Sequence, residues 1–276
     1  MTPPRRRPWI ALVGAPLLLA WLLLQLDDRR PVLPEPARAD DASARAQGAP
    51  VQSASAPFAL LELFSSEGCS SCPAAEALLS EIDRDARRQG ARVFCLAWHV
   101  DYWDHLGWKD PYAERAHAVR QRRYAQRMKL RSVYTPQLVV NGREELVGSS
   151  RGGARRAIER ALRAPAALGV ELQVDLSLSG AAAVSWRLSG PAPEGARLWL
   201  VLAEGGLVSA VRSGENSGRE LHHEAVARAH RETAAEREGK AVLRLPEGLR
   251  RERASVLAFI QAARSGEVLG VARLGL

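Results

Sequence analysis

The chain has 276 residues, of which 46% are hydrophobic and 25% are charged. This composition is that of an ordinary globular protein, and it excludes a wholly disordered chain, a collagen-like repeat and a membrane protein with many spans. The length suits one large domain or two smaller ones, at roughly 100 to 200 residues each. The formal net charge of +8 is mild and its arginines are scattered, which argues against nucleic-acid binding.

The first residues indicate export. An arginine triplet at residues 5–7 precedes an apolar run over residues 9–26. A helix of about 18 residues is about 27 Å long, against a hydrocarbon core of about 30 Å. We therefore expect residues 1–26 to form an uncleaved transmembrane anchor, with a cleaved signal peptide as the alternative. Because cytoplasmic flanks are rich in arginine, the rest of the chain is expected in the periplasm or outside the cell, attached to the inner membrane by a single span.

Two folded segments follow a linker. Residues 27–57 have no apolar period and predict a flexible tether between the membrane and the folded part. Residues 58–165 alternate buried strands with amphipathic helices, which predicts an α/β domain with crossover connections and a mostly parallel sheet. The expected strands span 58–64, 92–100 and 137–141, and the expected helices span 73–89, 112–128 and 151–162.

The pattern changes after Pro165. Apolar and polar residues alternate, which is typical of strands with one wet face, and Gly and Pro fill the turns. We therefore predict that residues 166–276 form a second domain, a small antiparallel β-sandwich. Its expected strands span 170–178, 184–188, 198–202, 241–245 and 256–260.

The chemistry of the chain is expected at a pair of cysteines. Cys69 and Cys72 are separated by two serines and lie between the first strand and the first helix. At a helix N-terminus, the free N–H groups and the positive end of the dipole favour a thiolate. A thiol in that setting has its pKa lowered from about 8.5 to between about 3.5 and 7.5, so we expect Cys69 to attack and Cys72 to resolve. Cys95, the third cysteine, lies on a buried strand and is expected to be inert.

A proline begins the third strand. Pro136 follows Thr135, and proline is rarely placed at a strand start unless its missing donor is useful. In thioredoxin-like proteins a proline at this point forms a cis bond, lies against the dithiol and leaves the preceding backbone free for an incoming peptide. The segment from Cys69 through Pro136 to the last helix resembles the thioredoxin fold.

Five longer motifs narrow this resemblance: ELFSSEGCSSCP, HVDYWDHLGWKDPY, QRRYA, LRSVYTPQLVVNGR and GENSGRELHH. They are similar to a bacterial thioredoxin-like family of exported proteins catalogued as a domain of unknown function (DUF1223). The resemblance covers residues 58–276 and implies the fold, but it implies no substrate.

Glu62 lies in the middle of an apolar strand, where an unpaired carboxylate is costly to bury. By the resemblance to thioredoxins, it is a candidate proton acceptor beneath Cys72. The alternative is a carboxylate at a strand edge that reaches water.

Polar and aromatic residues crowd the loop after the second strand, among them His99, Asp101 and Trp103. The carboxyl ends of strands in an open sheet are where ligands bind, and the dithiol lies at the same rim. One interpretation is a lid over the sulfurs, in which His99 and Asp101 tune the thiolate or shuttle protons. A second is a copper or zinc site formed by the two cysteines and His99. The third is a loop whose polar groups satisfy local backbone.

These observations predict a membrane-tethered thiol-disulfide oxidoreductase that needs no cofactor and acts on the thiols or disulfides of proteins or small molecules. The competing hypothesis is a binding module in which the cysteines form a permanent disulfide or hold a metal. A peroxidase is a weaker third hypothesis, because no Thr-x-x-Cys pattern precedes Cys69.

Overall fold

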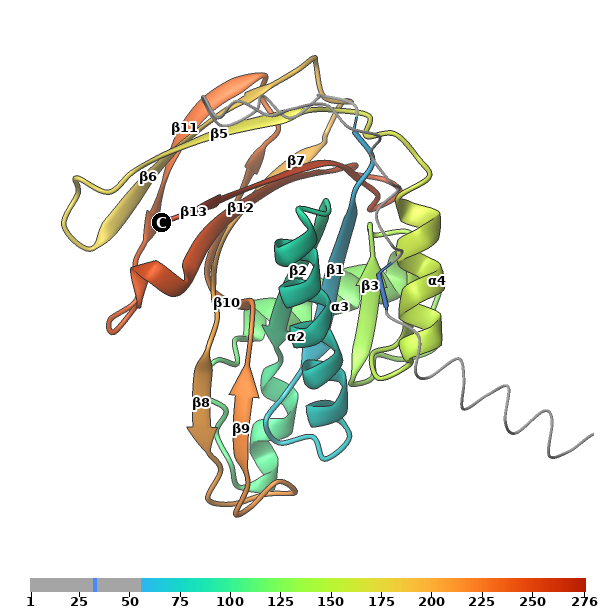
Figure 1. Ribbon diagram of the computed structural model, residues 1–276, viewed down its shortest axis with the longest axis vertical. Coiled ribbons are helices and arrows are strands. Elements are labelled where there is room, and N and C mark those ends of the chain that lie inside the picture. The colour runs from blue at the N-terminus through green and yellow to red at the C-terminus, as the bar shows by residue number, and fades with distance from the viewer. Residues whose placement is uncertain (1–31, 34–55) are drawn as a thin grey trace, which may run out of the picture.

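The structure is a computed structural model that describes residues 32–33 and 56–276, and Figure 1 shows one long twisted sheet with helices on both faces. The sheet has eight strands in the order β13-β12-β7-β10-β2-β1-β3-β4. A three-stranded sheet, β11-β6-β5, and a hairpin, β8-β9, accompany it. The strands are β1 Ala59–Ser65, β2 Val93–His99, β3 Gln137–Val140, β4 Glu144–Val147, β5 Val170–Asp175, β6 Ala181–Leu188, β7 Arg197–Glu204, β8 Leu207–Ala210, β9 Glu220–His223, β10 Val226–Ala234, β11 Glu238–Arg244, β12 Ala254–Gln261 and β13 Val268–Gly275.

The helices divide between the two faces of the long sheet. Two α-helices, α2 (Cys72–Gln89) and α4 (Arg151–Ala161), pack on one face, and α3 (Arg115–Arg127) packs on the other. Two short 3₁₀ helices, η1 (Asp101–Leu106) and η2 (Arg251–Arg253), lie in loops. The long sheet separates the core beneath α2 and α4 from the core beneath α3, and a third core lies between it and the three-stranded sheet.

Strand β1 contributes residues to the first two of these cores. All seven of its residues are buried, because helices cover both faces of the sheet here. Leu61 and Leu63 pack under α2, whereas Leu60 and Phe64 pack under α3. Successive side chains of a strand point to opposite faces, and this two-residue period places Glu62 on the α3 side.

The second half of the chain does not form a separate sheet, which differs from the predicted boundary after residue 165. Strand β10 pairs in parallel with β2, through Val226 and Ala97, and carries β7, β12 and β13 into the same sheet. Strand β7 is almost entirely buried, because the three-stranded sheet covers its other face. The sandwich predicted for residues 166–276 is therefore present as a local stacking of two sheets, one of which continues through the whole molecule.

The expected elements are found, with ends shifted by a few residues. The expectation of a mostly parallel sheet is wrong: only β1 with β2, and β10 with β2, pair in parallel, among the pairs within the described residues. Strand β3 runs antiparallel to β1, and β4 returns through the turn at Asn141 and Gly142, where both residues have positive φ. Strands β4, β8, β9, β10 and β13 were not predicted. Three of them have only four residues, β10 mixes charged and apolar residues, and β13 contains two glycines, which weaken a strand pattern.

The predicted anchor over residues 1–26 lies outside the described residues. Within the predicted linker, Val32 and Leu33 are described and buried in the core beneath α2 and α4, so this point of the segment is packed rather than free. Across the part of the chain that the structure describes, every helix is too short or too polar to cross a membrane.

Candidate redox site

Cys69 and Cys72 are joined in a disulfide at the point where β1 leads into α2. Their Cα atoms are 5.4 Å apart, and the Cys72 N–H donates to the Cys69 carbonyl at 3.2 Å. Cys72 is the first residue of α2, and Pro73 occupies the first turn, where a missing N–H is tolerated. Both cysteines are 1% exposed, while Ser70 and Ser71 between them are exposed. The pair therefore stands where the sequence predicts, with one edge of its loop at the surface.

The predicted proline lies beside this helix start. The Thr135–Pro136 bond is cis. A Cβ added at Gly148 would lie 3.1 Å from Ala75 Cβ in the first turn of α2 and 3.2 Å from Pro136 Cβ, so Gly148 packs closely against both. Trp103, on η1, donates its indole N–H to the Thr135 hydroxyl at 2.8 Å. The Trp103 Cβ also lies 3.0 Å from a Cβ built on Gly68, so η1 covers the loop before Cys69.

A loop from the second half of the chain closes over the disulfide. It connects β8 to β9, and its Asn216 is fully buried. The Asn216 amide donates to the carbonyls of Glu67 and Cys69 at 2.8 and 3.0 Å, and Glu215 accepts the Ser70 N–H at 2.9 Å. These contacts join the two halves of the chain at the cysteine loop, and they explain why the sulfurs are shielded from solvent.

We expect Asn216→Ala to speed reduction of the disulfide by dithiothreitol roughly tenfold, because the carbonyls of Glu67 and Cys69 each lose a donor and one unsatisfied buried group costs about 1 to 3 kcal/mol. The rate is measured by thiol labelling of the folded protein. Ser217→Ala is the matched control, since its hydroxyl donates to the Arg212 carbonyl within the same loop. Equal rates for wild type and Asn216→Ala would show that this cap does not limit access.

Buried charged side chains flank the disulfide on both sides. Glu76 lies one turn after Cys72 and Glu67 lies two residues before Cys69. The His223 ring bridges them: its Nδ1 contacts a Glu76 oxygen, and its Nε2 lies 3.0 Å from Glu67 Oε1. His99 Nδ1 lies 2.7 Å from Asp110 Oδ2, which also accepts the Glu67 N–H at 2.8 Å. Three carboxylates therefore face two imidazoles inside the protein, and they hold both ends of the cysteine loop.

The histidines and carboxylates of this cluster shift one another's pKa values toward the charged forms. Although burial lowers the pKa of His223, Glu76 and Glu67 raise it to about 10. Burial also lowers the pKa of His99, but Asp110 and Glu76 raise it above its usual value. Burial raises the pKa of Glu76, yet the two imidazoles bring it below its ordinary range. His223 is therefore held as a cation, and the two imidazoles and three carboxylates form one charged network.

His99 thus differs from its predicted place. Its ring is fully buried below the cysteine loop, so it is not part of a lid, whereas Trp103 on η1 does cover that loop. Asp101 begins η1 and is half-buried. The groups able to hold a metal among the described residues include neither cysteine. Cys95 is buried, and burial raises its pKa well above the usual value, so it stays a protonated thiol.

Glu62 does not lie beneath Cys72, which corrects the prediction for this residue. Its side chain points to the α3 face, whereas α2 and Cys72 cover the opposite face. There the carboxylate accepts from Arg120 Nε at 2.6 Å and Nη2 at 2.9 Å, and from the Trp98 indole at 2.9 Å. Glu62 is 1% exposed, so the alternative of a strand edge that reaches water is also wrong. It is the partner of a buried arginine.

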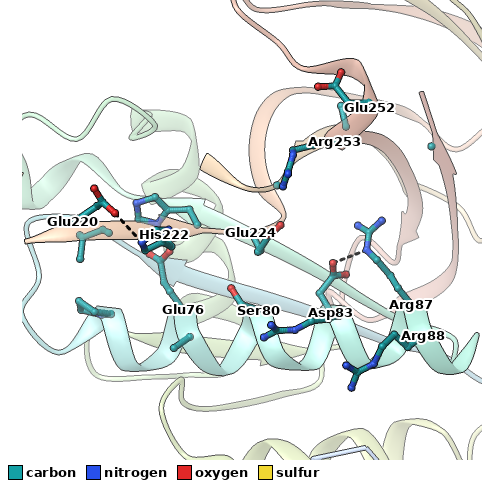
Figure 2. A pocket seen from close by; sticks show the side chains of 18 of the residues that line it. Glu76, Ser80, Asp83, Arg87, Arg88, Glu220, His222, Glu224, Glu252 and Arg253 are labelled. Atoms are coloured by element: carbon teal, nitrogen blue, oxygen red, sulfur yellow. Dashed lines mark hydrogen bonds and ion pairs between the residues drawn. The ribbon is translucent and has the colours of Figure 1, made fainter. Parts of the chain in front are cut away.

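A groove of about 850 Å³ borders the site. Figure 2 shows Glu76, Ser80 and Asp83 on α2 along one side, with His222 of β9 and Arg253 of η2 across from them. Ser66, Pro73 and His223, which belong to the cysteine loop and its charged network, also line the groove. A partner lying in it would therefore approach the start of α2 from the side.

Residues 60–261 match the family described as protein of unknown function, DUF1223. The chain belongs to this family. It is similar to the X-ray crystal structure of an Agrobacterium tumefaciens protein, with a TM-score of 0.59 and 22% identity, covering 79% of this chain and 94% of that one. A domain of the outer membrane lipoprotein Omp28 from Porphyromonas gingivalis gives a TM-score of 0.25 and 14% identity, over 40% of this chain and 88% of that domain. No curated protein matches the chain.

Sequence reasoning missed most of the residues that surround the disulfide. Glu67, Glu76 and Asp110 read as ordinary surface residues of a loop or helix. The quoted motifs held the available signals: ELFSSEGCSSCP contains Glu67, HVDYWDHLGWKDPY contains Asp110, and GENSGRELHH contains Asn216 and His223. The roles of Asn216 and His223 depend on how β9 packs against α2, which the sequence does not indicate.

Proposed function

We propose that the chain is a thiol-disulfide oxidoreductase with a thioredoxin-like core and that Cys69 and Cys72 are its redox pair. The observation that carries this proposal is the disulfide at the junction of β1 and α2, with cis-Pro136 and the first turn of α2 both packed against Gly148. The order β2-β1-β3-β4, with α2 and α4 on one face and α3 on the other, supports the thioredoxin-like assignment. The A. tumefaciens structure supports only a shared fold.

The reaction is an exchange of two electrons. In the reducing direction the Cys69 thiolate attacks a sulfur of the substrate disulfide, which forms a mixed disulfide and releases one substrate thiolate. The Cys72 thiolate then attacks the Cys69 sulfur, which closes the Cys69–Cys72 bond and releases the second substrate thiolate. Both cysteine protons end on substrate sulfurs or in solvent. In the oxidising direction each step is reversed, and the difference in reduction potential selects between them.

The start of α2 supplies the electrostatic setting for this chemistry. The first N–H groups of a helix favour a thiolate by roughly 0.3 to 1 kcal/mol at an exposed site and more where it is partly buried. We propose Trp103 and Thr135 as the surface that a substrate meets, because they join η1 to the proline loop. Glu62 has no part in the proposed reaction, since it lies on the other face of the sheet.

We further propose that the N-terminal apolar segment tethers this domain to the inner membrane, with the redox site on the periplasmic side. An oxidising compartment suits an exchanging disulfide, whereas the cytosol keeps thiols reduced. Partners would then be the thiols or disulfides of exported proteins or of small molecules. The proposal requires no cofactor.

The burial of both sulfurs favours one competing function, a binding module with a permanent disulfide. Both cysteines are 1% exposed, and Asn216 locks their loop to the second half of the chain. In that case the disulfide would brace the groove beside α2 for a partner and would exchange with nothing. The two functions differ in one property, whether substrate sulfur forms a covalent bond to Cys69.

We expect Cys72→Ala to accumulate mixed disulfides through Cys69 in cells, because the resolving thiol is gone. Adducts are measured by acid trapping, non-reducing gels and mass spectrometry. Cys69→Ala/Cys72→Ala is the matched control and should form none. If Cys72→Ala forms no more adducts than the double variant, the chain does not exchange disulfides through Cys69, and the binding module is favoured.

A further inference from the structure

A second group of histidines lies on the other face of the sheet, away from the cysteine loop. It comprises Glu114, His117 and His230, whose ligand atoms all lie within 4.8 Å of one another. Glu114 Oε2 lies 3.8 Å from His117 Nε2 and 4.0 Å from His230 Nδ1. Two residues come from the start of α3 and the third comes from β10, so the two halves of the chain meet here.

The His117 side chain has a buried nitrogen that is free to bind a metal ion. Its ring is 1% exposed, and its Nδ1 donates to the His99 carbonyl at 2.8 Å, which fixes the tautomer and leaves the lone pair on Nε2. That Nε2 is buried and has no hydrogen-bond partner among the described residues. Metal-binding histidines commonly use their second nitrogen in this way.

The backbone at the start of α3 also positions Glu114 near the His117 Nε2 atom. The His99 carbonyl also accepts the Glu114 N–H at 3.2 Å, so one carbonyl positions both residues of α3. Glu114 is the N-cap residue of α3, yet its side chain makes no cap hydrogen bond. It is therefore available to the histidines.

An irregularity in β10 directs His230 to the same place. The register with β7 shifts between Ala227 and Ala229, so these two residues pack on opposite faces of the sheet instead of the same one. Without this shift, His230 would point away from α3, because successive residues alternate. As it is, its ring stacks on Trp199 at 5.9 Å and lies 5.5 Å from the His117 ring.

We propose that Glu114, His117 and His230 form a binding site for a divalent transition metal ion of the zinc type. Two imidazoles and one carboxylate form a donor set of zinc sites that keep an open position. A tetrahedral zinc ion separates ligand atoms by about 3.3 to 3.5 Å at its usual bond lengths. The two separations from Glu114, 3.8 and 4.0 Å, need only a small contraction, which its side chain can supply because it is 47% exposed.

Glu114 supplies the negative charge of this site. The nearby Arg120 guanidinium is paired with Glu62, and Glu232 on β10 is paired with Arg123 and Arg197. The open side of the site faces solvent through Glu114, so an ion can enter without rearrangement of the core. A bound ion would clip α3 to β10 and stabilise the contact between the two halves of the chain.

The test is calorimetric titration of zinc ions into the full chain, purified in detergent and treated with a chelator, with the Cys69–Cys72 disulfide intact. We expect one zinc ion per chain, and about tenfold or greater loss of affinity in Glu114→Gln and in His230→Gln. His222→Gln is the matched control, because it removes an exposed histidine already paired with Glu220. Its affinity should equal that of wild type.

Thermal unfolding with and without zinc gives a second readout, since an ion that binds the folded state raises the melting temperature. The zinc-dependent rise should be lost in Glu114→Gln, whose exposed side chain can be replaced without disturbing the core. The proposal is overturned if wild type binds no stoichiometric zinc, or if Glu114→Gln and His230→Gln both keep wild-type affinity.

Discussion

His223→Gln should reduce the free energy of unfolding by about 3 to 5 kcal/mol, the usual cost of removing one partner from a buried ion pair. His223 is 2% exposed and its two ring nitrogens contact Glu76 and Glu67. Without the imidazolium, these carboxylates face each other with no cation between them. Urea unfolding followed by circular dichroism measures the loss.

His222→Gln is the control for this substitution. It makes the same change at the neighbouring residue, but that side chain is 69% exposed, so the expected effect stays within about 0.5 kcal/mol. Glu76→Gln combined with His223→Gln should cost less than the sum of the single variants, because the ion pair between Glu76 and His223 is lost only once. Equal small losses at positions 222 and 223 would contradict the assigned ion pairs.

The same residue makes stability depend on pH. The pKa of His223 is raised from 6.5 to about 10 in the folded protein. A raised pKa means that protonation favours the folded state, so this stability is fully present below pH 6.5 and is lost as pH rises toward about 10. The difference in unfolding free energy between wild type and His223→Gln should therefore shrink over this interval. A difference that stays constant or grows would show that His223 is not held as a cation.

Glu62→Gln should also cost about 3 to 5 kcal/mol, because it leaves Arg120 charged and buried. Arg120 is 3% exposed, and its guanidinium lies 4.1 Å from the centre of the Trp199 ring. Water cannot replace the lost carboxylate in that aromatic setting. Glu232→Gln removes a partly exposed partner of Arg123 and Arg197, and its expected cost is about 1 kcal/mol or less.

Glu62→Gln should leave the rate of Cys69 thiol exchange unchanged at temperatures where the variant is folded. This follows from the sheet, which separates Glu62 from α2. The rate is measured with a small disulfide reagent on the reduced protein, with Cys95→Ala as background. A slower exchange in a variant of normal stability would show that Glu62 does take part in the thiol chemistry.

Local patterns predicted the elements of the first half well. The strand over residues 58–64 and the helix over 73–89 were found because apolar spacing, a proline near the helix start and Gly90 at its end all agree. The place of the disulfide followed from the same junction. These features depend on neighbours in the sequence, which is why they could be predicted.

The face of Glu62 and the place of His223 could not be predicted in that way. A buried strand covered on both sides gives no alternation, so its sequence does not tell which residues lie under α2. His223 reaches Glu76 across 147 positions in the chain, and this depends on how β9 packs on α2. Likewise, the one sheet that joins both halves rests on the short parallel contact between β10 and β2.

The measurement that tests the central proposal most directly is the reduction potential of the Cys69–Cys72 couple. The folded Cys95→Ala protein is equilibrated with dithiothreitol buffers of known potential, and the free thiols are counted by alkylation and mass spectrometry. An exchanging pair should open and close reversibly with a midpoint above about −300 mV, within the range of known thiol-disulfide oxidoreductases. A disulfide that stays closed well below about −300 mV would be structural, and it would contradict the proposed function.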